Sequence, residues 1–375
     1  MKTIVLPFVR DLEKRLQESD PLIQVVVGPR QVGKTTGVQL LLSAHEKTFH
    51  YVSADGVIAK DPAWITEQWV LAQSKGSETL LVIDEIQKVE NWSEAIKNLW
   101  DKQVSHKKKL KVILLGSSSL SIQKGLTESL AGRYFLHRVW HWSPRESQDA
   151  YNLSFDQYLC FGGYPGSYRF ISEPHLWLRY VRDSIIDSVI GRDILSLVRV
   201  KSPALFKQCF DLACANATQE ISYNKLLGQL QDRGNIELIK NYLAHLEAAF
   251  LIKTLHKFSS TPLTRKASSP KILPLCPALY SVTLDAHLDQ EQIGRAFELY
   301  VGTSLLRKPG QLFYWRERNH EVDYVYTHQK EIIALEVKSG RVRRTSGLHE
   351  FSKKFPHAQL KIITKENALD ELEKL

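Results

Sequence analysis

The chain has 375 residues, of which 43% are hydrophobic and 24% are charged. This balance is ordinary for a globular protein and excludes a mainly disordered, collagen-like or fibrous chain. Fifty Lys and Arg against 41 Asp and Glu give a formal net charge of +9, which favours an anionic partner, nucleic acid before a membrane surface. The surplus of positive charge gathers in two stretches, Lys102–Lys111 and Lys338–Lys354.

Membrane and disulfide signals are weak. No apolar run approaches the roughly 18 residues that span a bilayer, and the N-terminal run Ile4–Val9 is too short for a signal sequence. The cysteines form no CxxC pair and no metal-ligand spacing, so we expect buried free thiols at Cys160, Cys209, Cys214 and Cys276. These observations predict a cytoplasmic protein with no membrane partner.

Five apolar runs in the first 145 residues alternate with helical patterns, which predicts an α/β fold with a five-stranded parallel sheet. Their near-continuous apolar character is typical of strands that are covered on both faces. The predicted strands are Ile23–Gly28, Phe49–Asp55, Thr79–Glu85, Lys111–Ser117 and Tyr134–Trp140.

The first predicted strand leads directly into GPRQVGKTT, residues 28–36, which fits the P-loop pattern G-x-x-x-x-G-K-[ST] between a strand and a helix. The loop would present its N–H groups to phosphates, Lys34 would reach the β- and γ-phosphates, and Thr35 would offer its hydroxyl to Mg²⁺. We therefore predict an ATP site. Its predicted residues in this loop are Gly28, Pro29, Arg30, Gln31, Val32, Gly33, Lys34, Thr35 and Thr36.

Four residues beyond the loop complete the predicted ATP site. Asp84 ends an apolar strand and would bind Mg²⁺ through water, while Glu85 would polarise the attacking water, which favours hydrolysis over simple nucleotide storage. Ser117, or Ser118 beside it, is placed to touch the γ-phosphate, although serine is also a common turn residue. Arg133 could contact the γ-phosphate of a neighbouring subunit in a homo-oligomer, or simply cap its helix.

The middle of the chain is mainly helical. Residues 142–200 carry a helical pattern that breaks at Phe161–Ser167, and Arg192 is either an ion-pair partner or a nucleotide sensor. Three short helices and a strand between Pro203 and Lys257 suggest a winged helix, with Asn235–Phe250 as its recognition helix. Because the polar face of that helix is not strongly basic, we favour a structural or protein-contacting role for it.

A second group of candidate residues follows a stretch, Phe258–Leu275, whose Ser, Thr, Pro and Lys content predicts an exposed linker. Glu298 lies on a predicted helix, and Asp323, Glu336 and Lys338 lie on a predicted hairpin. Two carboxylates and a lysine can hold one or two Mg²⁺ ions and orient a hydroxide for phosphodiester cleavage, with Glu298 as a further ligand. The ordinary alternative is a hairpin with a surface salt bridge between Glu336 and Lys338.

In its order of motifs the chain resembles the prokaryotic AAA-type predicted ATPases with an uncharacterised C-terminal half. The motifs are GPRQVGKTT, LLVIDEIQKVENW, LLGSSSL, SLAGR, FGGYP, GRD, GRAFE, YWRERNHEVDYV and LEVKSG, and they extend from residue 28 to 340. The resemblance implies a P-loop ATPase domain (1–148), a helical and winged-helix region (149–265) and a restriction-endonuclease-like domain (266–375). One departure, at residues 141–146, leaves the local turn there in doubt.

These features predict an ATPase coupled to a nucleic-acid-acting, Mg²⁺-dependent nuclease-like domain, with DNA as the first choice of substrate. Lys338–Lys354, with Arg341, Arg343 and Arg344, is where a phosphate backbone should dock. One alternative keeps the ATPase and makes the C-terminal domain a binding module for nucleic acid or protein. Another, a small-molecule kinase, is disfavoured by the length of the chain and its extra domains.

Overall fold

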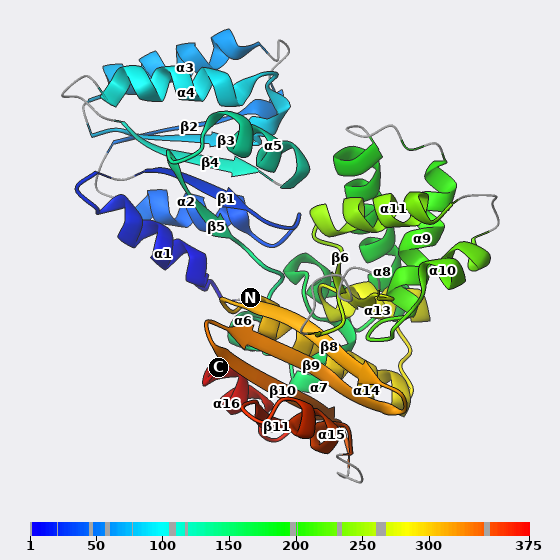
Figure 1. Cartoon of the computed structure of the whole chain (residues 1–375). Coiled ribbons are helices and arrows are strands. Elements are labelled where there is room, and N and C mark those ends of the chain that lie inside the picture. The colour runs from blue at the N-terminus through cyan, green and yellow to red at the C-terminus, as the bar shows by residue number, and fades with distance from the viewer. Residues whose placement is uncertain are drawn as a thin grey trace. The chain divides into compact units, whose positions relative to one another are not determined.

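The computed structural model describes residues 2–20, 22–44, 48–56, 61–76, 78–104, 110–116, 119–195, 200, 202–230, 235–259, 268–340 and 346–375. The chain forms two compact units, one of Met1–His141 with Asp149–Tyr151 and one of Trp142–Gln148 with Asn152–Leu375. Each unit is described by itself below (Figure 1). In the described parts of the chain, we find no helix with the length and apolar character that a membrane crossing requires.

A five-stranded parallel sheet with the order β2-β3-β4-β1-β5 forms the centre of the N-terminal unit. Every residue of β1 and β3 is buried, as expected for strands that helices cover on both faces. The predicted α/β class and parallel sheet are therefore confirmed. The strands are β1 (Ile23–Val27), β2 (Phe49–Ser53), β3 (Leu80–Asp84), β4 (Lys111–Gly116) and β5 (Tyr134–Arg138).

Helices flank this sheet: α1 and α2 lie beside β1 and β5, and α3 and α4 lie beside β2 and β3 (Figure 1). α3 begins at Pro62 because the preceding Asp61 side chain accepts a hydrogen bond from the Ala63 N–H, and proline fits the first helical position. The helices are α1 (Pro7–Leu16), α2 (Lys34–Ala44), α3 (Pro62–Ser74), α4 (Trp92–Val104) and α5 (Ser119–Ser129), with short 3₁₀ turns η1 (Ala54–Gly56) and η2 (Ile86–Lys88).

The segment that follows is helical, as predicted. At the departure near residues 141–146, Ser143 and Glu146 form a reciprocal capping box that starts α6, so a regular helix start replaces the doubtful turn. The elements are α6 (Pro144–Tyr151), α7 (Phe155–Phe161), the 3₁₀ helix η3 (Pro165–Phe170), α8 (Pro174–Arg179), and the π-helices η4 (Tyr180–Ile186) and η5 (Val189–Leu195).

Three further helices, α9 (Pro203–Ala215), α10 (Tyr223–Gln229) and α11 (Ile236–Ala248), precede a small antiparallel sheet of β6 (Ile252–Leu255) and β7 (Lys271–Pro274). The predicted linker over Phe258–Leu275 is wrong at its C-terminal end, because every residue of β7 is buried. Its polar composition comes mainly from residues 260–267, which lie outside the described residues, and it concealed the short apolar run that forms β7.

The C-terminal part contains a four-stranded sheet with the order β11-β10-β9-β8. The predicted hairpin is confirmed, because β9 (His320–His328) and β10 (Glu331–Lys338) pair antiparallel, while β10 and β11 pair in parallel. Side chains from β8, β9 and β10 share a buried apolar cluster with Leu348 and Phe351 of α15. The remaining elements are α13 (Pro277–Ser281), η6 (Val282–Leu284), α14 (Gln290–Leu306), β8 (Gln311–Glu317), α15 (Ser346–Lys354), β11 (Gln359–Thr364) and α16 (Ala368–Glu373).

Candidate functional site

The predicted P-loop lies between β1 and α2, at the carboxyl ends of the parallel strands. Two of its residues, Gln31 (φ 61°) and Gly33 (φ 88°), have left-handed backbone conformations, which curl the loop. Gly28 is required for a different reason, because a Cβ at this position would lie 2.4 Å from the Val139 carbonyl oxygen. The loop is therefore shaped by its own glycines and by the chain that follows β5.

Lys34 is buried at the centre of the loop. Its Nζ donates hydrogen bonds to the carbonyl oxygens of Gly28, at 2.9 Å, and of Pro29, at 2.6 Å. Lys34 is also the first residue of α2, so the ammonium group and the helix N-terminus add positive charge in one place. This combination is the usual protein environment for the phosphates of a nucleotide.

Asp84, at the end of β3, accepts two hydroxyl hydrogen bonds on the same carboxylate oxygen. Thr35 Oγ1 lies 2.8 Å and the Tyr51 hydroxyl 2.9 Å from Asp84 Oδ2. A carboxylate and a threonine hydroxyl side by side are oxygen ligands of the kind that Mg²⁺ prefers, so these residues fit the predicted metal. Tyr51 is a site residue that sequence analysis missed, because only the pairing of β2 with β3 brings it beside Asp84.

Glu85 follows Asp84 with a left-handed backbone (φ 53°), and its N–H donates to Asp84 Oδ1 at 2.9 Å. Its own carboxylate accepts a hydrogen bond from Gln87 Nε2 at 2.5 Å. The turn thus places two adjacent carboxylates at the carboxyl end of the sheet, beside the P-loop. This is the arrangement that the predicted roles of Asp84 in metal binding and of Glu85 in water activation require.

Three further residues are predicted or possible nucleotide contacts: Ser117, Arg133 and Arg192. Ser117 lies outside the described residues. Arg133 precedes β5 at the amino end of the sheet, because Tyr134 pairs with Ile23, and it forms an ion pair with Asp101 at 2.7 Å. Within its own chain Arg133 is therefore remote from the P-loop, and a contact with a neighbouring subunit stays a prediction. Arg192 is exposed on the π-helix η5.

Replacing Tyr51 with phenylalanine should weaken Mg²⁺-dependent ATP binding several-fold without unfolding the protein. The variant keeps the aromatic ring, but Asp84 loses one of its two hydrogen bonds from hydroxyl groups. A typical hydrogen bond contributes about 1 kcal/mol. The measurement is ATP affinity as a function of Mg²⁺ concentration. Tyr134→Phe serves as a control at the opposite end of the sheet, and equal effects of both variants would contradict the assignment.

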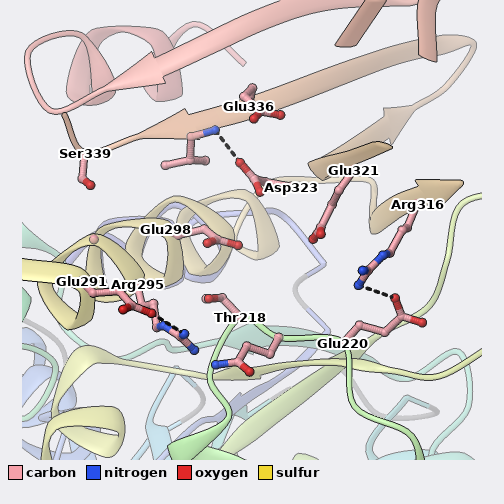
Figure 2. A pocket seen from close by; sticks show the side chains of 13 residues that line it. Thr218, Glu220, Glu291, Arg295, Glu298, Arg316, Glu321, Asp323, Glu336 and Ser339 are labelled. Atoms are coloured by element: carbon pink, nitrogen blue, oxygen red, sulfur yellow. Dashed lines mark hydrogen bonds and ion pairs between the residues drawn. The ribbon is translucent and has the colours of Figure 1, made fainter. Parts of the chain in front are cut away.

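The second candidate site is a cavity of about 560 Å³ in the C-terminal unit. Its lining includes Glu298 from α14, Glu321 and Asp323 from β9, and Glu336 from β10 (Figure 2). Two further acids of the lining, Glu220 and Glu291, are paired with Arg316 and Arg295. Asp323 and Glu336, which lie on adjacent strands, thus line one cavity as predicted. The opposite wall includes Thr218, Gln219 and Glu220, from the chain between α9 and α10.

Hydrogen bonds fix Asp323 to the backbone of β10 and Glu336 to Lys338. Asp323 Oδ2 accepts from the Val337 N–H at 2.7 Å, and Lys338 Nζ donates to Glu336 Oε1 at 2.5 Å. The second carboxylate oxygen of Glu336, Oε2, is buried without a hydrogen-bond partner. Burial, and secondly the charge of Asp323, raises the pKa of Glu336 to about 7, against the opposing effect of Lys338. The salt bridge of the ordinary alternative is therefore present, but it is largely buried.

Lys271 of β7, which sequence analysis missed, is the cation at the base of this group. It is 1% exposed, and its Nζ lies 2.7 Å from Glu298 Oε1, 3.6 Å from Glu321 Oε1 and 4.0 Å from Asp323 Oδ1. Burial alone would lower the pKa of Lys271, but these carboxylates raise it well above its usual value. The only sequence signal was a lysine inside a short apolar run, and the linker composition around it concealed that signal.

The predicted third metal ligand, Glu298, is thus held by a lysine. Burial raises the pKa of Glu298 to about 7, and the Lys271 ammonium opposes that effect. Across the ranges that the structure describes, no three or more His, Cys, Asp and Glu side chains are grouped so as to hold a metal ion. Asp323 and Glu336, with the unpartnered Oε2 atom, are the part of the predicted set that fits a divalent cation.

The parallel sheet and the loop geometry are those of a P-loop nucleotide-binding domain. The comparisons agree: residues 20–148 match the family described as AAA domain, and residues 152–289 and 293–374 match two families described as domains of unknown function. An uncharacterised protein of Methanocaldococcus jannaschii is 24% identical over 389 residues, which cover 95% of this chain and 84% of the relative.

Two solved structures show weaker likeness. The RuvB Holliday junction branch migration motor of Thermotoga maritima has a TM-score of 0.35 and 14% identity, and covers 68% of this chain and 87% of its own. The Orc1 protein of Aeropyrum pernix, in complex with DNA, has a TM-score of 0.32 and 11% identity, and covers 77% of this chain and 93% of its own. Likeness at this level supports no conclusion about ligands or partners.

Proposed function

We propose that this protein hydrolyses ATP at the P-loop and acts on nucleic acid, DNA in the first place, through the C-terminal cavity. The observation that supports the second part most strongly is the group formed by Asp323, Glu336 and Lys338, with one buried carboxylate oxygen of Glu336 unpartnered. An unpartnered carboxylate oxygen is costly to bury, so its presence in a cavity favours a cationic ligand.

In the ATP reaction, the P-loop N–H groups and Lys34 would bind the phosphates. Thr35 and Asp84 would hold Mg²⁺, which when bound supplies positive charge beside the β- and γ-phosphates. Glu85 would accept the proton of the attacking water, which adds to the γ-phosphorus as the bond to the β-phosphate oxygen breaks. Residues that keep these groups in place, such as Tyr51, would act through Asp84.

In the C-terminal cavity, Asp323 and Glu336 would hold a divalent cation, which when bound supplies a positive charge for a phosphodiester oxygen. Lys338, beside Glu336, would stabilise negative charge on the phosphate or orient the attacking water. The predicted docking residues Arg341, Arg343 and Arg344 follow β10 directly in sequence but lie outside the described residues. Hydrolysis would add water across one phosphorus–oxygen bond and needs no further reactant.

Coupling between the two reactions is part of the proposal. ATP state would rearrange the middle helices and so present or withhold the C-terminal site. The proposal also includes a cytoplasmic setting, the three-part division at residues 1–148, 149–265 and 266–375, and a homo-oligomer in which Arg133 contacts a neighbouring nucleotide.

The test is nucleic-acid cleavage by the purified full chain with Mg²⁺ or Mn²⁺, with and without ATP, on duplex DNA, single-stranded DNA and RNA. We expect cleavage that falls at least about a hundredfold in Glu336→Gln and in Lys338→Met, since each removes a charged group from the reaction centre. Glu331→Gln, an exposed acid at the other end of β10, is the matched control. Cleavage that is absent, or equal in all variants, would contradict the nuclease proposal.

A second candidate function is a nucleic-acid or protein-binding module that ATP switches without cleavage. The observation in its favour is the ion pair between Lys271 and Glu298, which occupies a carboxylate that the nuclease prediction assigned to metal. This function predicts DNA binding that weakens steeply with salt, because bound lysines and arginines release counterions from the phosphates. Binding with this salt dependence and no detectable cleavage would favour it.

A further inference from the structure

We propose that Lys271 is the built-in cation of the C-terminal cavity, and that it restricts this site to a single divalent cation held by Asp323 and Glu336. The proposal rests on the proposed function of the cavity and assigns to Lys271 the place that a second metal ion would take beside Glu298. Lys271 is thus a positioning residue that sets the metal content of the site.

The position of Lys271 supports this assignment. β7 carries the side chain to a fully buried position, where its Nζ lies between Glu298 on α14 and the two acids of β9. Nζ also donates to the Asp323 carbonyl oxygen at 3.2 Å and lies 5.1 Å from the centre of the Tyr324 ring. Carboxylates, a carbonyl and an aromatic face surround the ammonium, so all its neighbours favour a positive charge at this point.

The charges of the group lead to the same conclusion. Two acids of the cavity wall are paired with arginines, Glu291 with Arg295 and Glu220 with Arg316, so their charges cancel. The other four carboxylates (Glu298, Glu321, Asp323 and Glu336) stand against two ammonium groups (Lys271 and Lys338), which leaves a formal charge of −2 when all are ionised. One divalent cation would neutralise this charge, whereas a second would leave an uncompensated positive charge in a largely buried place, which is costly.

The two carboxylates at either end of the group differ in a way that locates the ion. Glu298 Oε1 and Glu336 Oε2 are both buried without a hydrogen bond of good geometry, but Glu298 Oε1 lies 2.7 Å from the Lys271 ammonium, whereas the Lys338 ammonium contacts the other oxygen of Glu336, Oε1. The Glu336 side chain is 11% exposed and the Oε2 atom itself is buried, so water does not readily satisfy that oxygen. A hard cation with oxygen ligands, such as Mg²⁺ or Mn²⁺, matches the Glu336 side of the group.

The test counts bound Mn²⁺ by electron paramagnetic resonance of the free ion, on the full chain without nucleotide or nucleic acid. Every protein carries Asp84→Asn, so that the ATP site does not contribute. We expect the protein with Asp84→Asn alone to bind one Mn²⁺ ion. Adding Glu336→Gln to that protein should abolish this binding. Lys271→Met frees Glu298 as a ligand and should add a second ion, or tighten binding at least about tenfold, a common effect of changes beside a metal site.

The double variant Lys271→Met/Glu298→Met removes both charges of the pair together, a change that buried ion pairs often tolerate. It should bind one Mn²⁺ with unchanged affinity, and it keeps the proposal testable where Lys271→Met alone does not fold. Three results would each overturn the proposal. They are two Mn²⁺ ions bound to the protein that keeps Lys271, no additional or tighter Mn²⁺ binding in a folded Lys271→Met protein, and loss of Mn²⁺ binding in the double variant. Because no nucleic acid is present, absence of cleavage would refute the proposed function and leave this count intact.

Discussion

Replacing Glu85 with glutamine should lower ATP turnover at least about a hundredfold while ATP binding stays close to its original strength. Glutamine has nearly the shape of glutamate and cannot accept the proton of the attacking water. It can still form a hydrogen bond with Gln87, which now contacts the Glu85 carboxylate at 2.5 Å. The measurements are phosphate release at saturating ATP and equilibrium binding of a fluorescent ATP analogue.

Lys34→Ala should affect the earlier step and remove ATP binding itself. The Lys34 ammonium lies inside the loop, where it donates hydrogen bonds to two backbone carbonyls, and alanine would offer the phosphates no charge at this position. Glu90→Gln, an exposed acid in the same segment as Glu85, is the control and should leave both quantities unchanged. Unchanged ATP turnover in Glu85→Gln would show that Glu85 does not take part in hydrolysis. Unchanged ATP binding in Lys34→Ala would refute the assignment of this loop as the ATP site.

The ATP site was largely predictable because its signals are local in sequence. A buried strand, nine loop residues and a helix follow one another, and parallel pairing brings the end of β3 beside the loop. Tyr51 was not predictable in the same way, since its contact with Asp84 depends on the length and register of β2 rather than on any motif. Strand direction places Arg133 at the amino end of the sheet of its own chain, so its predicted contact with the nucleotide of a neighbouring subunit stays a prediction.

The sequence predicted Glu298, Asp323, Glu336 and Lys338 of the C-terminal site, and it missed Glu321 and Lys271. Alternation along β10 placed Glu336 and Lys338 on one face, and the hairpin brought Asp323 to them. Lys271 lies 52 residues before Asp323, whose carbonyl it contacts, and nothing in its local sequence indicates that contact. Composition was misleading here, because a polar average over Phe258–Leu275 concealed a buried strand of four residues.

Gly347→Ala should destabilise the C-terminal unit by about 3 kcal/mol or more, although the sequence gives no sign that this glycine matters. Gly347 is the second residue of α15, and a Cβ there would lie 1.8 Å from the Glu321 carbonyl oxygen and 2.8 Å from its carbon. The obstacle is backbone, so no side chain can rotate away to relieve it. β9 is an inner strand, and Glu321 pairs with Arg316 of β8, which limits how far this carbonyl can move.

The helix must therefore move, and with it Leu348 and Phe351, which α15 contributes to the apolar cluster on the sheet. Thermal unfolding followed by circular dichroism is the measurement. Gly340→Ala is the matched control, because no atom of the residues that the structure describes lies within 4 Å of a Cβ there. The same strand carries Glu321 and Asp323 into the cavity, so displacement of α15 should also weaken Mn²⁺ binding in the chain that carries Asp84→Asn. A Gly347→Ala protein as stable as the Gly340→Ala control would show that α15 does not pack on β9 at this distance.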